Sequence, residues 1–348
     1  MNDLTLKFIQ YAQTPLPLKP KLAPWVSVID IGDNRLHLRG ADLVVPLLHP
    51  LFVETFYKIK PLLDGDHSVE QITAIGGNKI LPTTIEFLLK MLRANGILQE
   101  GGKNSEIEES NPEVEDLRQF FSHYTQNPDG MISALTQTRL GVIGKGQLKD
   151  AIINTASQNQ IKTIMEFSVD EVDTSGLETK FKDVDFIIAC SENAGYAFFE
   201  SINTLCLKTG TRWMRVAMEG TSAFLGPTII PNQTACFHCY TKRVLSNSND
   251  PEGFEAYQNH FQKNNIPDNE GILPVFWDLV NAEVVLEIVR IITGFAPPST
   301  IGRTIQTSTS FARNEHDIFR LPRCPVCRTR SNHQEIWNLD SLIENDQS

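Results

Sequence analysis

The 348-residue sequence contains no apolar run that approaches the ~20 residues of a membrane-spanning helix. Its N-terminal stretch, MNDLTLKFIQYAQTPLPLKP, lacks the apolar core between a basic start and a small-residue cleavage site that marks a secretory signal. Positive charge is also scarce, since 31 Lys and Arg stand against 42 Asp and Glu and the formal net charge is −11. A nucleic-acid partner requires a surplus of cations on one face. We therefore expect a cytoplasmic protein whose partner is neither a membrane nor a nucleic acid.

Cysteine is rare as well, because the chain has six and four of them fall in two Cys-x-x-Cys pairs. The pairs are Cys236 with Cys239 and Cys324 with Cys327. A reducing compartment disfavours disulfides, and two such turns can bring four thiolates to one ion at ~2.3 Å. Two unrelated turns or a redox pair are the competing interpretations. We predict a structural zinc ion (Zn2+), because four sulfur ligands leave no open position for water.

A chain of this length favours two domains. Apolar and polar residues alternate over 25–47, which predicts three short strands joined by tight turns. Three helices are then predicted: one at 51–63 from its apolar spacing, a short one that begins after a cap at Ser68, and one at 84–94. The expected division is an N-terminal extension (1–24), a winged-helix-like α+β domain (25–100), an acidic linker (101–117), an α/β domain (118–335) and a C-terminal tail (336–348).

Beyond the linker, strand-like segments alternate with helical stretches. The strand candidates are residues 139–144, 161–167, 184–190 and 213–218. This alternation is typical of an α/β fold with a Rossmann-like, mostly parallel sheet covered by helices.

The first of these strands ends in Gly144-Lys145-Gly146 and opens a helix near Leu148. A doubly wound fold places nucleotide phosphates at such a turn. A second strand ends near Glu166, twenty residues past Gly146, which is the spacing of an acid that binds a ribose. The turn needs glycine whether or not a nucleotide binds, so both interpretations stay open.

The order of these segments resembles the ubiquitin-activating-enzyme-like (ThiF-like) superfamily. The resemblance rests on the glycine turn at 144–146, the block at 183–239 that runs from DVDFIIACSEN into the first zinc turn, the apolar helix around 277–294 and the final RCPVC. It implies a strand, a helix and a second strand that lead into the zinc turns, and commonly a homodimer.

The small N-terminal domain is similar to that of two narrower groups. One is the microcin C-type peptide-adenylating enzymes, and the other is the leader-peptide-binding proteins that assist YcaO cyclodehydratases in making azoline-containing peptides. In the second group this domain is the RiPP recognition element, whose helix pattern resembles LLDGDHSVEQI (62–72) and TIEFLLKMLRANGILQE (84–100). The implied partners are a ribosomally made precursor peptide and a YcaO-type cyclodehydratase.

Two departures from the adenylating pattern predict a catalytically silent domain. The family's Gly-x-Gly-Gly-x-Gly loop reads GKGQLK at 144–149, so its last two glycines are absent. Only 39 positions separate Gly146 from Asp185, and residues 161–183 lack the Asp-x-Asp that serves ATP and Mg²⁺ in the active family. Without a positioned metal and cationic clamps, the barrier to adenylyl transfer is not lowered. ATP is therefore not expected as a cofactor.

The helix predicted at 84–94 carries two apolar stripes. Positions 85, 88, 89 and 92 have the spacing of a core face, and Phe87 with Met91 forms a second pair. Beside the predicted strand Asp42–Leu47, this pair would line a groove in which an extended peptide adds to a sheet edge. Residues 21–100 hold 8 Lys and Arg against 9 Asp and Glu, which disfavours DNA. The predicted peptide-binding residues are Leu43, Val45, Phe87, Lys90, Met91 and Arg93.

The favoured function is a non-catalytic adaptor that captures a leader peptide and presents it to the cyclodehydratase. An adenylating enzyme acting on a peptide C-terminus is the alternative. A dinucleotide-dependent oxidoreductase is a third hypothesis, which only Glu166 favours.

Overall fold

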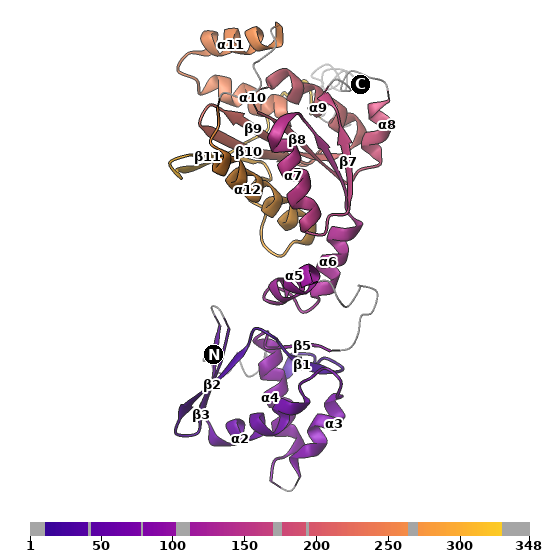
Figure 1. The fold of residues 1–348 in the computed structure, drawn as a ribbon, viewed down its shortest axis with the longest axis vertical. Coiled ribbons are helices and arrows are strands. Elements are labelled where there is room, and N and C mark those ends of the chain that lie inside the picture. The colour runs from indigo at the N-terminus through magenta and orange to yellow at the C-terminus, as the bar shows by residue number, and fades with distance from the viewer. Residues whose placement is uncertain are drawn as a thin grey trace, which may run out of the picture. The chain divides into compact units, whose positions relative to one another are not determined.

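The computed structural model describes residues 11–40, 43–77, 79–101, 112–169, 176–192, 195–263 and 271–328. The chain forms two compact units, Met1–Thr136 and Gln137–Ser348 (Figure 1). Asp42, most of the predicted linker (102–111) and the predicted tail lie outside the described residues. The domain limits given above stay predictions.

Unit 1 contains two small antiparallel sheets. The strands expected within residues 25–47 are confirmed: they are β2 (Ser27–Gly32), β3 (Arg35–Arg39) and β4 (Val44–Leu47), in the order β2-β3-β4. The second sheet pairs β1 (Pro20–Leu22) with β5 (Leu98–Glu100). β1 comes from the segment expected to be an extension, and its backbone pairing makes that segment part of the fold of unit 1.

Five described helices accompany these sheets in chain order. They are α2 (Pro50–Ile59), α3 (Val69–Thr73), α4 (Pro82–Ala94), α5 (Pro112–Ser122) and α6 (Pro128–Gln137), with 3₁₀ turns at Lys60–Leu62 and Ala74–Gly76. α2 ends earlier than expected because Pro61 has no N–H to continue the helix. Ser68 caps α3 through the predicted reciprocal bonds with Gln71. α5 begins inside the expected linker, and Pro112 with acidic residues in its first turn suits a helix start.

The core of unit 1 joins the buried sides of α2 and α4 with the inward side chains of β3 and β4. All four positions of the predicted core stripe, 85, 88, 89 and 92, are at most 1% exposed. They belong to one cluster with Leu36 and Leu38 of β3 and Phe56 of α2. The stripe is therefore confirmed as the core face of α4.

Unit 2 is built on a seven-stranded mixed sheet in the order β12-β11-β10-β9-β8-β6-β7. β7, β6, β8 and β9 are parallel to one another, and β10, β11 and β12 extend the sheet in antiparallel fashion. The strands are β6 (Arg139–Ile143), β7 (Thr163–Phe167), β8 (Phe186–Ser191), β9 (Arg212–Glu219), β10 (Ser222–Ile229), β11 (Arg303–Ser308) and β12 (Arg313–Asp317). The parallel part confirms the α/β prediction, whereas the antiparallel part was not predicted.

Helices cover both faces of this sheet. They are α7 (Gly146–Gln158), α8 (Leu177–Lys182), α9 (Tyr196–Thr209), α10 (Phe237–Ser246), α11 (Pro251–Lys263) and α12 (Pro274–Thr293). α8, α9 and α10 share one buried cluster with the sheet. α7 and α12 lie side by side (Figure 1), where Asn281 Nδ2 donates to Thr155 Oγ1 at 2.6 Å.

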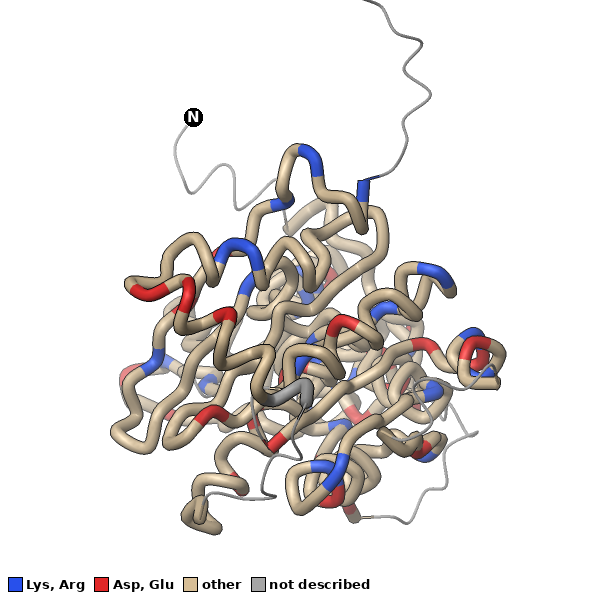
Figure 2. Tube along the Cα trace, turned by 90° about the horizontal axis from the view of Figure 1, so that it is seen from above, with Lys and Arg blue, Asp and Glu red and all other residues tan. Residues whose placement is uncertain are grey.

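Acidic and basic positions are interspersed along the described chain (Figure 2). Within that part of the chain, no helix is both long and apolar enough to cross a bilayer.

Candidate functional site

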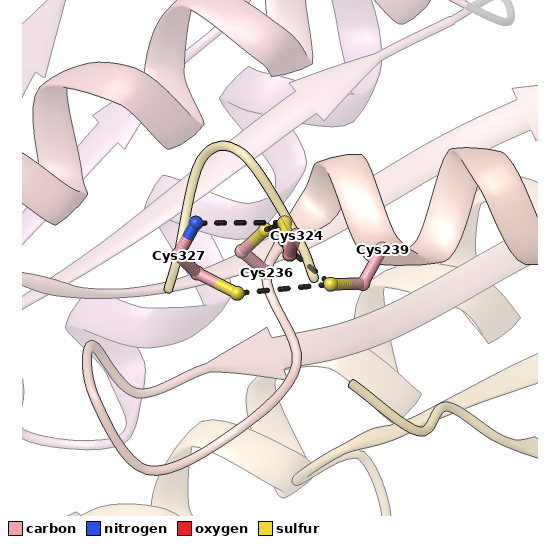
Figure 3. A group of neighbouring side chains, drawn as sticks. All are labelled: Cys236, Cys239, Cys324 and Cys327. Atoms are coloured by element: carbon pink, nitrogen blue, oxygen red, sulfur yellow. Dashed lines mark hydrogen bonds between the residues drawn. The ribbon is translucent and has the colours of Figure 1, made fainter. Parts of the chain in front are cut away.

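The four predicted metal ligands form one buried cluster in unit 2 (Figure 3). All four Sγ atoms lie within 4.8 Å of one another. Cys236 Sγ is 3.8 Å from both Cys239 Sγ and Cys324 Sγ, and Cys239 Sγ is 3.7 Å from Cys327 Sγ. A regular tetrahedron with metal–sulfur bonds of ~2.3 Å has edges of about 3.8 Å, whereas a disulfide would need about 2.05 Å. The donor set and its spacing therefore fit one tetrahedral zinc ion.

Two distant turns supply these sulfurs. Cys236 is the N-cap of α10 and Cys239 lies in its first turn, while the other two cysteines lie on a turn after β12. Backbone N–H groups stabilise the sulfurs: Leu321 donates to Cys239 Sγ at 3.4 Å and Cys327 donates to Cys324 Sγ at 3.5 Å. The cluster thus ties the segment after β12 to the start of α10.

The hydrogen bonding of Cys239 favours the deprotonated sulfur that metal binding requires. The Cys236 thiol donates toward Cys239 Sγ and lowers the pKa of Cys239 to about 4. A lowered pKa favours the thiolate, which is the form that binds metals. His238 stands between the first two cysteines in the sequence, but its Nδ1 lies 3.6 Å from Glu200 Oε1 and it is not part of the sulfur cluster.

The glycine turn lies between β6 and α7, as predicted. Gly146 begins α7 with φ +82°, a conformation that favours glycine. A side-chain carboxylate also occupies this helix start: Leu148 N–H donates to Glu192 Oε1 at 3.0 Å. A Cβ at Gly146 would lie only 2.2 Å from the same oxygen, so the carboxylate packs directly on the turn.

The predicted ribose-binding acid is engaged with a neighbouring cation. Lys149 Nζ lies 2.9 Å from Glu166 Oε2, and the Lys149 side chain is 16% exposed. Lys149 stands where the adenylating pattern has its last glycine. The candidate nucleotide-binding residues therefore lie around the start of α7. There Glu192 already accepts a backbone hydrogen bond, and Lys149 is already paired with Glu166.

Sequence reasoning missed Glu192. The signal available in the sequence was its place shortly after the predicted strand at 184–190. In the structure this strand lies next to β6 in the parallel sheet. Carboxyl ends of neighbouring parallel strands meet at one edge, so a polar residue there points to the same site as the glycine turn.

The described residues of the predicted peptide groove all lie in unit 1, on or just before β4 and on α4. Val45 is buried and pairs with Leu38 of β3, so it belongs to the core. Phe87 is half-buried, with its ring stacked 6.0 Å from Phe52 and edge-on to Tyr11 at 6.2 Å. Met91 is half-buried against the same core. These side chains form a continuous apolar surface, and their role in peptide binding stays a prediction.

The two predicted rim cations both have partners within the unit. Lys90 Nζ lies 2.7 Å from Glu86 Oε1, and Arg93 Nη1 donates to the Leu98 carbonyl at 2.9 Å. Burial lowers the pKa of Arg93 from its ordinary value.

A cavity of about 670 Å³ adjoins the start of β4. Leu43 and Arg93 both line it, so the residue just before β4 lies near the last turn of α4. α5 closes the other side, where His123 follows the helix and stacks on Trp25 at 4.8 Å. The sequence did not reveal this wall, because the next domain was expected to begin at residue 118.

A buried cation lies in the core of unit 2, between the sheet and the helices that lead to the cysteine cluster. The Arg215 side chain is fully buried, and its Nη2 donates to Glu219 Oε1 at 2.6 Å. Its guanidinium carbon lies 5.1 Å from the Phe199 ring centre and 5.2 Å from that of Tyr240. Its Nε and Nη1 have no hydrogen-bond partner among the described residues, so aromatic faces take over part of the solvation of this charge.

Solved structures share this fold at low sequence identity. The heterocyclase TruD matches with a TM-score of 0.64 and 20% identity, over 89% of this chain and 43% of that protein. A structure titled E. coli MccB + MccA-N7isoASN matches with a TM-score of 0.62 and 13% identity, over 88% of this chain and 99% of that protein.

Curated relatives match by sequence over a shorter region. The vegetative HesA protein of Trichormus variabilis is 25% identical over 169 residues, which is 49% of this chain and 56% of that protein. HesA of Leptolyngbya boryana is 23% identical over 163 residues and is covered to 51%. This chain thus spans about half the length of these relatives. The model of the ThiF family matches residues 147–328, the region that holds nearly all of α7, the parallel strands β7, β8 and β9 and all four clustered cysteines, and so this chain belongs to the ThiF family.

Proposed function

We propose that this chain is a leader-peptide-binding adaptor. Unit 1 captures the leader of a ribosomally made precursor peptide, and the ThiF-like unit docks a YcaO-type cyclodehydratase that forms azoline heterocycles. The observation that carries the proposal is the outer edge of β4, which no described strand covers and which lies beside the apolar surface of α4.

Peptide binding follows from that edge. β4 is the last strand of the β2-β3-β4 sheet, so its outward backbone groups can pair with an added strand. Phe87 and Met91 are only half-buried, which leaves apolar surface for side chains of the added peptide. The similar solved structures include a heterocyclase in complex with its substrate and cofactor, and E. coli MccB with MccA-N7isoASN.

The absence of catalysis follows from the glycine turn. Phosphates bind helix starts through free N–H groups and the positive end of the helix dipole. Here the Glu192 carboxylate already accepts from Leu148, and Lys149 is paired with Glu166. A second anion at this position would meet like-charge repulsion.

The cysteine cluster has a structural role in this proposal. Four sulfur ligands complete the coordination of a zinc ion and leave no position for a substrate. The ion would hold the segment after β12 against α10 and so keep the sheet and its helices in one arrangement.

The decisive experiment combines this chain with a candidate precursor peptide and a YcaO-type enzyme. We expect one water to be lost per heterocycle only when this chain, ATP and the enzyme are all present, as followed by mass spectrometry. The ATP–pyrophosphate exchange catalysed by this chain alone should stay at background. Exchange that depends on a peptide C-terminus would reject the adaptor and support a peptide-adenylating enzyme.

A further inference from the structure

The backbone groups on the outer edge of β4 follow from the turn that precedes the strand. Gly40 N–H donates to the Leu43 carbonyl at 3.0 Å, and Leu43 N–H donates to the Gly40 carbonyl at 3.2 Å. In an antiparallel pair, such doubly bonded positions alternate with positions whose backbone groups point away. Val44 lies opposite Arg39 in the next, non-bonded position.

The same alternation fixes the rest of the strand. Val45 turns its N–H and carbonyl toward β3, and Pro46, opposite His37, turns outward like Val44. Val44 therefore offers one donor and one acceptor to an added strand. Pro46 has no N–H and offers only its carbonyl. Among the described residues, no backbone group pairs with these outward groups.

The side chains alternate in the opposite sense. Val45 and Leu47 are buried on the inner face, whereas Val44 is 42% exposed on the outer face. Arg39 lies on the outer face directly across from Val44 and is exposed, with no ion pair among the described residues. A peptide side chain placed beside Val44 on this face would lie within reach of the Arg39 guanidinium, because the long Arg39 side chain can extend across the shorter Val44 side chain.

We infer that the β4 edge accepts an extended peptide in one register, through three backbone hydrogen bonds and one acidic side chain. Val44 exchanges two of these bonds with the peptide, and the Pro46 carbonyl accepts the third from a peptide N–H. The peptide residue beside Val44 on the outer face carries Asp or Glu, attracted by Arg39. This inference rests on the proposed function and specifies the register and the charge of its ligand. The missing donor at Pro46 also disfavours edge-to-edge pairing between two copies of the chain, because such pairing needs a complete ladder.

The first test is a scan of single N-methyl groups along a fluorescein-labelled candidate leader peptide that carries acidic residues, measured by fluorescence anisotropy. The amides that donate to the Val44 and Pro46 carbonyls are two residues apart, whichever way the peptide runs. We expect methylation at these two amides to weaken binding by about 10-fold or more, and methylation of the amide between them to have little effect. Pro46→Ala should restore a donor and tighten binding by about 2- to 10-fold.

The second test is a charge exchange. Arg39→Glu should weaken leader binding, and replacing the acidic leader residue with Lys should restore it for this variant alone. Arg35→Glu is the matched control, because Arg35 is on the same strand but is already paired with Asp33 at 3.2 Å. Circular dichroism verifies that each variant is folded.

The outcomes separate this inference from the proposed function. A leader that does not bind the unmodified chain rejects the adaptor itself. A leader that binds, yet shows no pair of sensitive amides two residues apart and no response to Pro46→Ala or Arg39→Glu, overturns the register and leaves the adaptor standing.

Discussion

The Glu192 carboxylate lies at the start of α7, where its Oε1 accepts a hydrogen bond from the Leu148 N–H at 3.0 Å. The two residues are 44 positions apart. Leu148 lies in α7, the helix that follows β6, and Glu192 follows β8, the parallel neighbour of β6. This contact places a fixed negative charge at the position where the fold would otherwise present free N–H groups to a phosphate. In the proposed adaptor, the same contact would both stabilise α7 and disfavour nucleotide binding.

Replacing Glu192 should lower the stability of the protein. Glu192→Ala removes both the hydrogen bond and the favourable charge at the helix start, and we expect about 1 kcal/mol less unfolding free energy in urea. Glu255→Ala, at an exposed position inside α11, is the matched control and should cost less. A Glu192→Ala variant as stable as the wild type would show that the carboxylate does not cap α7.

Nucleotide binding should be weak or undetectable in the wild type. Calorimetry with ATP and Mg²⁺ measures it directly, and we expect no adenylate because Glu192 and Lys149 already fill the site. Clear exchange activity that is abolished by Lys145→Ala would contradict this prediction and favour the adenylating alternative.

The cysteine cluster should contain about one zinc ion per chain, as measured by metal analysis of the purified protein. Cys324→Ser or Cys236→Ser should lose the metal and much of the stability, because a structural zinc ion contributes ~10 kcal/mol or more to folding. Cys206→Ala is the control, since this buried thiol lies outside the cluster and its loss should leave the metal in place. A chain that folds fully without metal would exclude a structural role.

Leader binding should depend on the second stripe of α4 rather than on its core stripe. Phe87→Ala or Met91→Ala should weaken binding by about 1 to 3 kcal/mol, as is usual for interface anchors, while circular dichroism remains native. Leu88→Ala should instead unfold unit 1, because Leu88 is fully buried. Reversing the charge of Lys90 should change mainly the association rate and its salt dependence. We expect a small change, because Glu86 already neutralises much of the Lys90 charge in the wild type. Folded Phe87 and Met91 variants that bind like the wild type would place the peptide elsewhere.

The buried Arg215 should depend strongly on its single carboxylate partner. Glu219→Ala leaves the fully buried guanidinium with aromatic neighbours only, and we expect about 3 kcal/mol less unfolding free energy. The double change Arg215→Met with Glu219→Ala should recover part of that loss, because no unpaired charge remains. Chemical denaturation of the single and double variants measures this coupling, and strictly additive losses would argue against it.

Acid should weaken one exposed side-chain contact in the segment of unit 1 that connects α2 to α3. The hydrogen bond from His67 Nδ1, 2.9 Å from Asp64 Oδ2, lowers the pKa of Asp64 to about 2. A lowered carboxyl pKa adds stability that is present above the unfolded value of about 4 and is lost as the pH falls toward the folded value. Thermal melts of the wild type should therefore decline more than those of Asp64→Asn between about pH 4 and pH 2. Parallel curves would show that the contact adds nothing.

Local patterns in the sequence determined several features of this protein. The two Cys-x-x-Cys turns predicted the metal ligands because each turn places two sulfurs together by its own geometry, and the structure confirms that all four meet. The spacing in α4 predicted its buried face, and the reciprocal cap at Ser68 predicted the start of α3, since both depend on residues within a few positions.

Only the tertiary structure decided the features that join distant segments. The contact of Glu192 with Leu148, the ion pair of Lys149 with Glu166 and the aromatic surroundings of Arg215 all depend on the order of strands in the sheet, which no local pattern encodes. The antiparallel strands β10 to β12 and the open edge of β4 were decided in the same way. A strand's propensity is local, but its neighbour and its register are set by long-range packing of the buried face.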